Sequence, residues 1–418
     1  MKMCRRLAVA SLLALFASRH SYASSSETNC DVGTVEEDCV AANDNEFFFC
    51  TDRYSWEWSQ DVQQLPKQAS DSLCITMDSD VIPDLLQTEI LVLGGCDGDT
   101  QLNEGDCPSL STSTRVYDPY LDVFTSQMEM PTERFRSAAV NVSQHVYLFG
   151  GRDLNGSLVC QVDRYDASEG TWETLDTTQE TDCYSDHAGV ASDDGTIFLF
   201  GGYDGDYESY DTVVKVEVDG DELTFSTTTP MEQHRGDHVC TRIPGSSEVY
   251  CMGGFTNNNG NFEILSSVER FDMETETWET RTSMVLPRAD FALGHLNGRI
   301  TVVGGEDEDG PMDDVEWYDP EENCWTDSGN LFDLPYKRLR YCGATHESEQ
   351  RMYIFGGQSL EESNASYYVI NDAVNWYQEV LVDELMPSSA ARAWSRGLHT
   401  GLLATFMVAT LALVAGLS

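Results

Sequence analysis

Short apolar stretches separated by polar turns run through most of the chain, and one phrase recurs among them. The apolar triplet Leu91-Val92-Leu93 leads into a glycine doublet. Six doublets occur, at Gly94-Gly95, Gly150-Gly151, Gly201-Gly202, Gly253-Gly254, Gly304-Gly305 and Gly356-Gly357. Successive doublets begin 56, 51, 52, 51 and 52 residues apart. A fixed period near 50 residues is the signature of a repeat protein.

Each repeat contains further positions that predict a four-stranded antiparallel sheet. An Asp downstream of the doublet is followed six residues later by a large aromatic residue, as in Asp166 and Trp172. Another apolar stretch precedes each doublet from the second onward, at 137–142, 187–191, 238–242, 291–296 and 341–345. Four short apolar stretches per unit, divided by turn residues, are typical of strands. Because glycine weakens a strand, the doublets indicate places where neighbouring sheets approach closely.

Three features repeat at this period: the doublet, an Asp that follows an aromatic or apolar residue, and the later Trp. Together they resemble kelch repeats over residues 71–380. The resemblance implies an all-β fold, a six-bladed β-propeller of four-stranded antiparallel blades in the galactose-oxidase-like superfamily. Packing six sheets around one axis would bury both faces of each. The departures are mild: Val218 precedes Asp219, Phe124 and Phe225 stand for Trp, and Ile370 replaces the last Asp.

The two ends of the chain carry targeting patterns. Residues 1–23 combine a basic start, a short apolar run and the small-residue site Ser21-Tyr22-Ala23, which predicts a secretory signal peptide. Residues 24–70 are a Cys-containing segment in which the aromatic run 47–58 is interpreted as a strand that closes the ring, with a disulfide-tied cap as the alternative. Small residues at Ser388 and Ser389, a spacer within 381–401 and the apolar tail 402–418 favour a glycolipid anchor over a membrane helix.

The charge balance excludes one class of partner. The 418 residues contain 72 Asp and Glu against 24 Lys and Arg, a formal net charge of −48. Such a surface repels phosphate backbones, so we expect no nucleic-acid partner. The acidic loops at 97–99, 204–206 and 306–309 suggest weak calcium binding at most, and turns are the favoured interpretation, so no cofactor is assigned.

Cysteines and sequons agree with a secreted glycoprotein. Without Cys4, which lies in the expected signal peptide, 12 of the 13 cysteines remain, an even number that favours disulfides. We expect the pairs Cys96–Cys107, Cys240–Cys251, Cys160–Cys183 and Cys324–Cys342, with Cys30, Cys39, Cys50 and Cys74 pairing among themselves. The sequons at Asn141 and Asn155 fall in predicted turns and the sequon at Asn364 in a polar loop, so we expect N-glycosylation there.

A candidate ligand site follows from the repeats. Ligands of propellers usually bind at the mouth of the central channel, on loops that lead into the innermost strands. The equivalent position before these strands holds Arg136, Asp186, Asp237, Asp290 and Arg340. This predicts an acidic arc over blades three to five flanked by two arginines, which would suit a cation or a carboxylate-bearing sugar. The alternative is that these charges pair with one another and cap the strands.

Three functional hypotheses remain from the sequence. The leading one is a secreted or surface-tethered, membrane-anchored module that binds a protein or a carbohydrate without catalysis. The second is a carbohydrate-active enzyme resembling kelch-type sialic-acid mutarotases or sugar oxidases, and the third is a structural coat or adhesion protein. The chain lacks His-Glu-x-x-His, Gly-x-Ser-x-Gly and phosphate-loop motifs, which argues against catalysis without excluding it. His187 and His238 are interpreted as recurring strand residues, and no metal is assigned.

Overall fold

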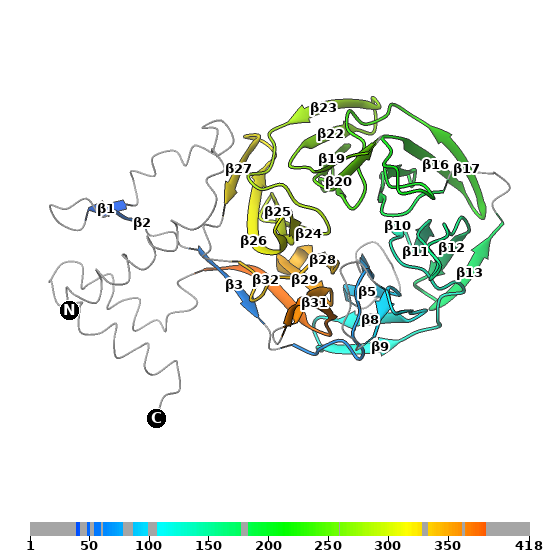
Figure 1. Cartoon of the computed structure of the whole chain (residues 1–418), viewed down its shortest axis with the longest axis horizontal. Coiled ribbons are helices and arrows are strands. Elements are labelled where there is room, and N and C mark those ends of the chain that lie inside the picture. The colour runs from blue at the N-terminus through cyan, green and yellow to red at the C-terminus, as the bar shows by residue number, and fades with distance from the viewer. Residues whose placement is uncertain are drawn as a thin grey trace.

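In a computed structural model, the chain forms six four-stranded antiparallel sheets arranged as blades around a central axis (Figure 1). The structure describes residues 39–41, 48–50, 54–59, 62–77, 87–98, 107–176, 183–258, 260–327, 333–361 and 364–381. The expected signal peptide, the C-terminal tail and the anchor residues Ser388 and Ser389 lie outside these ranges. The propeller predicted from the repeats is confirmed.

Each blade runs from an inner strand beside the axis to an outer strand at the rim. Blade one contains β4 (Leu73–Met77), β5 (Glu89–Leu93), β8 (Thr114–Asp118) and β9 (Val123–Ser126). Blade two contains β10 (Ala138–Val142), β11 (His145–Phe149), β12 (Val162–Asp166) and β13 (Thr171–Leu175). Blade three contains β14 (Ala188–Ala191), β15 (Ile197–Phe200), β16 (Val213–Asp219) and β17 (Glu222–Thr227).

The remaining blades follow the same order. Blade four contains β18 (Val239–Arg242), β19 (Glu248–Met252), β22 (Val268–Asp272) and β23 (Thr277–Arg281). Blade five contains β24 (Ala292–Leu296), β25 (Arg299–Asp307), β26 (Gly310–Asp319) and β27 (Cys324–Asp327). Blade six contains β28 (Cys342–His346), β29 (Arg351–Phe355), β32 (Val374–Leu381) and β3 (Tyr54–Ser59).

Shorter elements lie outside the blades. Two-stranded sheets pair β1 (Cys39–Ala41) with β2 (Phe48–Cys50) and β6 (Cys96–Asp97) with β7 (Ser109–Leu110). Two more pair β20 (Phe255–Asn258) with β21 (Asn261–Ile264) and β30 (Gln358–Glu361) with β31 (Asn364–Ile370). The 3-10 helix η1 (Glu347–Glu349) follows β28. Among the described residues, no helix has the length and apolar character needed to cross a bilayer.

The N-terminal segment closes the ring. Strand β3 pairs antiparallel with β32, with Tyr54 opposite Leu381 and Ser59 opposite Trp376. The Trp58 and Tyr377 rings pack 4.6 Å apart between their centroids. The last blade therefore takes its outer strand from a segment that precedes the first blade.

The glycine doublets lie where one blade meets the next. Gly201 and Gly202 have φ of +58° and +96°, and the Gly202 N–H donates to the Arg235 carbonyl of the next blade at 2.8 Å. A Cβ at Gly202 would lie 2.5 Å from the Ser185 carbonyl oxygen. Both the backbone conformation and the available space therefore require glycine.

The Asp and the aromatic residue of each repeat have separate roles. Asp166 Oδ1 accepts the N–H groups of Ser168 and Glu169, so this Asp shapes the turn to the outer strand. Trp172 Nε1 donates to Thr114 Oγ1 of the preceding blade at 2.9 Å. The aromatic residue of the outer strand thus ties its blade to the neighbour.

A buried arginine fixes the doublet in four of the blades. In blade five, Arg288 donates to the Gly304 carbonyl at 2.8 Å and pairs with Glu316 at 2.5 Å, and both side chains are fully buried. The arginines that donate in the same way to a doublet carbonyl are Arg134, Arg235 and Arg338. A buried charge is tolerated only with such partners. These arginines, which open the segments leading to the channel mouth, are therefore structural.

The disulfides correct two expectations, the pair Cys324–Cys342 and the pairing of Cys74 with one of Cys30, Cys39 and Cys50. The structure joins Cys96 to Cys107, Cys160 to Cys183 and Cys240 to Cys251. Cys342 is joined to Cys74 rather than to Cys324, because β28 and β4 are the inner strands of adjacent blades and place the two Cα atoms 5.4 Å apart. Cys324 is itself disulfide-bonded. The Cys74–Cys342 bridge links the first blade to the last.

The three sequons differ in setting. Asn155 lies exposed in a turn, where its N–H donates to Asp153 Oδ1. Asn141 was expected in a turn but lies in β10 opposite Val146, with its side-chain oxygen buried. The turn begins only at Ser143, whose φ is +55°. Asn364 was expected in a polar loop but is the first residue of β31. Glycosylation at the three sites stays a prediction.

Replacing one doublet glycine should destabilise the ring. We expect Gly202→Ala to lower the free energy of unfolding by roughly 2–4 kcal/mol, because it combines an unfavourable φ with overpacking. Gly205→Ala is the matched control, since nothing lies within 4 Å of its Cβ position and its φ is ordinary. Urea unfolding of both variants measures the difference, and equal midpoints would contradict the packing role of the doublet.

The bridge between the first and last blades should be found chemically. We expect peptide mapping under non-reducing conditions to recover Cys74 linked to Cys342. Replacing both cysteines with Ser should cost roughly 2–5 kcal/mol of stability, because the bridge closes a long loop. A peptide linking Cys324 to Cys342 would overturn the assignment.

Candidate functional site

Six equivalent residues, one from each blade, surround one mouth of the central channel. We call Asp71, Arg136, Asp186, Asp237, Asp290 and Arg340 the mouth ring. All six have positive φ, between +50° and +57°. In five of the six steps around the ring, the N–H of one member donates to the carbonyl of the member before it, at 2.8–3.1 Å. The backbone therefore sets the position of each side chain.

The structure brings together the five residues expected at the mouth and adds a sixth. Asp71 completes the ring between Arg340 and Arg136, and its N–H donates to the Arg340 carbonyl at 2.8 Å. Sequence comparison of the repeats missed Asp71 because blade one carries Ala69 where blade five has Arg288. The available signal was its place just before the inner strand β4.

The mouth ring lines a cavity of about 350 Å³ that also touches the start of every inner strand. Arg136 Nε lies 3.4 Å from Asp71 Oδ1 and 3.5 Å from Asp186 Oδ1. Arg340 Nε lies 2.9 Å from Asp290 Oδ2. The expected alternative, in which these charges pair with one another, therefore holds for both arginines.

Asp237 is the carboxyl at the centre of the acidic arc. Burial, followed by the neighbouring Asp186 carboxylate, raises the pKa of Asp237 to about 8. Its side chain is hydrogen-bonded to Asp186 and to the Tyr203 hydroxyl. Burial and the Asp237 charge likewise raise the pKa of Asp290. The Asp237 and Asp290 carboxyl groups are thus difficult to ionise together.

Several buried polar atoms at the cavity have no hydrogen-bond partner among the described residues. Two of them, Asp186 Oδ2 and Arg340 Nη1, belong to the mouth ring. The side chains are 2% and 9% exposed. Buried polar groups normally have a partner, so an acceptor and a donor are both left for a bound molecule.

A second ring of residues supports the first. The residue after each doublet forms a β-bridge with the residue before each mouth-ring member, as Tyr203 does with Ser185 and Phe255 with Gly236. Glu306 occupies this place in blade five, with Oε1 4.0 Å from Arg340 Nη2. Sequence reasoning missed Tyr203 and Glu306, although their fixed place after the doublet could have identified them.

Exposed apolar side chains lie on the loops that follow the doublets in blades two, three and four. We call Leu154, Tyr207 and Phe262 the apolar rim; they are 51%, 40% and 66% exposed. Phe262 stacks on Phe255 at 5.0 Å, and Tyr207 packs against Tyr203 at 6.1 Å. Through Phe255 and Tyr203, these rings adjoin the acidic arc.

The recurring histidines are packing residues. His187 and His238 are buried, and a Cβ at Gly150 or Gly201 would meet their rings. Burial lowers the pKa of His187 to about 4 and that of His238 well below its ordinary value. His238, Cys240 and Cys251 have ligand atoms within 4.8 Å of one another, but the two sulfurs are joined in a disulfide.

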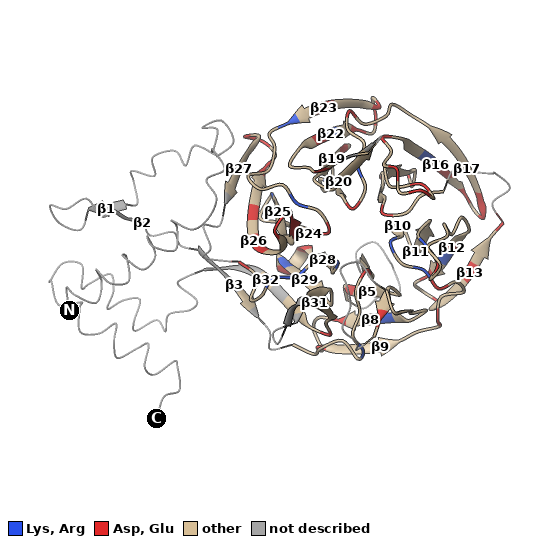
Figure 2. Cartoon of the chain, viewed as in Figure 1, with Lys and Arg blue, Asp and Glu red and all other residues tan. Residues whose placement is uncertain are grey.

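The acidic loops are organised as turns. Asp204 Oδ1 accepts the N–H groups of Asp206 and Glu208, and Asp307 Oδ1 accepts that of Asp309. Asp97 pairs with Lys67 at 2.5 Å. These contacts are ordinary turn and ion-pair chemistry. Acidic positions as a whole are spread around the ring rather than gathered on one blade (Figure 2).

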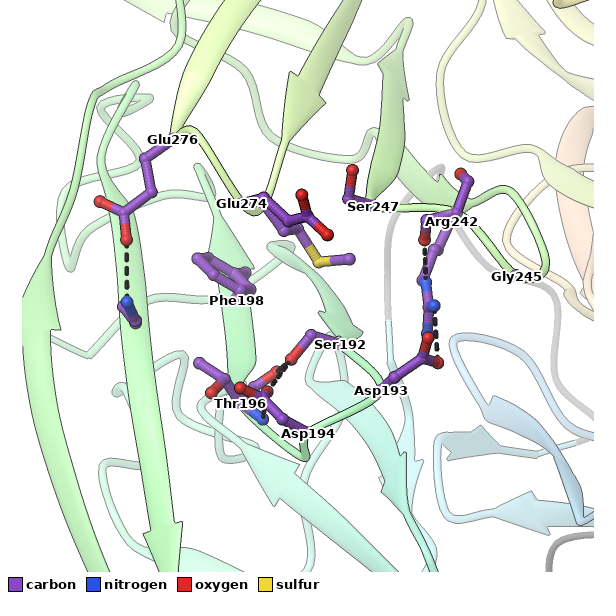
Figure 3. Close-up of a pocket in the computed structure, with 13 residues that line it drawn as sticks. Ser192, Asp193, Asp194, Thr196, Phe198, Arg242, Gly245, Ser247, Glu274 and Glu276 are labelled. Atoms are coloured by element: carbon purple, nitrogen blue, oxygen red, sulfur yellow. Dashed lines mark hydrogen bonds and ion pairs between the residues drawn. The ribbon is translucent and has the colours of Figure 1, made fainter.

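A second cavity, of about 490 Å³, opens between blades three and four at the strand ends away from the doublets. Its charged side chains are largely paired within the wall (Figure 3). Arg242 binds Asp193 at 2.6 Å, and Lys215 binds Glu276 at 2.8 Å. With both cations neutralised, this cavity has less to offer a charged ligand than the mouth ring.

The raised pKa of Asp237 predicts a pH-dependent stability. The pKa of the Asp237 carboxyl is higher in the folded chain, about 8, than in the unfolded chain, near 4. Its protonated form therefore stabilises the folded state fully below about pH 4, and this stabilisation is lost as the pH rises through about 8. The native chain therefore loses stability between pH 5 and pH 9, whereas Asp237→Asn does not. We expect the free energy of unfolding of Asp237→Asn, relative to that of the native chain, to rise by about 2–4 kcal/mol over this range. Chemical unfolding at both pH values measures this. Asp272→Asn, whose carboxyl has a lowered pKa, should differ from the native chain by a constant amount over that range.

Comparison with known proteins agrees with the six blades. Residues 84–305 and 137–357 match the KLHDC2/KLHL20/DRC7 Kelch-repeats domain. "Kelch repeat and BTB domain-containing protein 1" of Ectromelia virus (strain Moscow) is 28% identical over 215 residues, 51% of this chain and 36% of that protein. The camelpox virus (strain CMS) protein of the same name is 27% identical over the same length. "Kelch-like protein 36" of Rattus norvegicus is 28% identical over 160 residues, 38% of this chain and 25% of that protein.

The matched region spans about a third or less of the length of these relatives. The match to the repeat domain, in contrast, covers most of the propeller. Together with the six blades and their doublets, this assigns the chain to the kelch-repeat family.

Proposed function

We propose that this chain is a non-catalytic kelch propeller that binds a protein partner at the mouth ring, in a secreted or cell-surface-tethered form. The observation that carries the proposal is the apolar rim, on three neighbouring blades, beside a charged cavity. Apolar side chains grouped on a surface around polar groups are typical of protein interaction sites.

The loops are well suited to this role. They are held on a rigid sheet scaffold, which is where binding residues concentrate in many folds. The Arg152 guanidinium lies 3.6 Å from the Tyr207 ring centroid and donates to the Asp204 carbonyl at 2.5 Å, so it links the loops of blades two and three. A partner would therefore meet a preorganised surface, which reduces the entropy cost of binding.

The secreted or tethered form rests on the sequence pattern of the two ends and on the paired cysteines. Disulfides persist mainly in oxidising compartments. Peptide mapping on chain recovered from the medium or the cell surface tests this part of the proposal. Cysteines found reduced there, or no chain in either fraction, would contradict it.

Binding at the mouth can be tested without knowing the partner. Displayed random 12-residue peptides are selected on the native propeller, and the enriched peptides are measured again on the triple variant Leu154→Ala, Tyr207→Ala, Phe262→Ala. We expect at least tenfold weaker binding to the variant, because these exposed side chains form the contact surface.

A matched control removes exposed apolar residues elsewhere. Tyr120, Leu121 and Met128 lie on and beside the outer hairpin of blade one and are 79%, 61% and 53% exposed. Their triple alanine variant should bind the enriched peptides as the native chain does. If the two triple variants behave alike, or if no peptide is enriched, binding at this mouth is refuted.

A further inference from the structure

The acidic arc has a charge surplus that its own arginines do not balance. The mouth ring contains four aspartates and two arginines, so it carries two excess negative charges when every group is ionised. Arg136 pairs with Asp71 and Asp186, and Arg340 pairs with Asp290. Among the described residues, no cation forms an ion pair with Asp237.

A buried acceptor points into the same place. Asp186 Oδ2 has no partner among the described residues and lies in a side chain that is only 2% exposed. Asp237 lies beside Asp186 and keeps its proton below about pH 8. A cation at this point would supply the missing donor and replace that proton.

We propose that the mouth ring receives a lysine or arginine side chain of the partner protein, with its cationic group between Asp186, Asp237 and Asp290. This inference rests on the proposed function and names the residue type that the site recognises. The cavity, at about 350 Å³, is large enough for a long side chain.

The walls match the other parts of such a side chain. Ala188, Val239 and Phe291 line the cavity beside the arc and would contact the methylene stem, which Lys and Arg bury readily. Arg340 Nη1, also without a partner among the described residues, would donate to a carbonyl oxygen of the partner backbone. The apolar rim would contact the residues on either side.

Binding should be linked to pH. The groups that face Asp237 are Asp186, Asp290, Tyr203, Arg136 and Arg340. A cation binds the ionised arc, and Asp237 holds its proton below about pH 8. Affinity should therefore rise as pH increases from 6 to 9, and binding at pH 7 should release a proton.

The probe for the test is N-acetyl-arginine N-methylamide, compared with its neutral isostere, the citrulline derivative. Calorimetry on the native chain should show binding of the arginine probe at least tenfold tighter than the citrulline probe at pH 9. Asp237→Asn should weaken the arginine probe about tenfold and remove the pH dependence. Glu274→Gln, in the cavity of Figure 3, should change neither.

The outcomes separate this inference from the proposed function. Equal binding of the two probes, or no effect of Asp237→Asn, overturns the inference. If the peptides selected on the native chain depend on the apolar rim but lack Lys and Arg, the inference fails and the proposed function stands. If no rim-dependent peptide is found, the proposed function fails and the inference falls with it.

Discussion

Adjacent blades touch through their backbones at the glycine doublets, and at five of the six an N–H of the doublet donates to a carbonyl of the next blade, as Gly202 does to Arg235. The contact is possible only because the doublet has no Cβ and adopts positive φ. A single blade exposes an apolar face on each side and is not stable alone. The spacing between blades therefore decides whether the aromatic side chains of the outer strands can fill the gaps, as Trp172 does against Thr114.

Around that contact, the blades use different chemistry for the same purpose. Blade five holds its doublet carbonyl with a fully buried ion pair, Arg288 with Glu316. Blade six keeps the arginine, Arg338, but pairs it with the neutral Asn375 at 2.7 Å. Blade three has Tyr184 at the arginine position, where it packs against Tyr210. A buried ion pair contributes little more to stability than well-packed apolar side chains of similar volume. The repeats therefore tolerate replacement of one arrangement by another.

Much of the fold could be predicted from the sequence because the doublet repeats at a nearly constant interval. The position of the mouth ring followed from the same alignment, and five of its six members could be named. Asp71 was missed because blade one lacks the arginine that marks the other segments. The Cys342 partner was also missed, since Cys74 lies 268 residues away in sequence and only ring closure brings the two together. Asn141 was misplaced because the strand β10 extends further than its polar residues suggest.

The ionisation of Asp237 could not be foreseen either. It depends on burial and on the distance to Asp186, which belongs to another blade. Sequence spacing gives the identity of such groups, while only the closed ring gives their surroundings. The same holds for the exposed rings of the apolar rim, whose neighbours come from loops of different length.

The chain of hydrogen bonds around the mouth has an evolutionary consequence. Its members are held by backbone N–H and carbonyl groups, which are the same for every amino acid. An Asp and an Arg occupy the ring with nearly the same φ, +51° at Asp237 and +56° at Arg340. Substitutions at these positions can therefore change what the channel recognises while the loop keeps its shape. Duplicated copies of such a propeller are free to diverge in ligand preference one blade at a time.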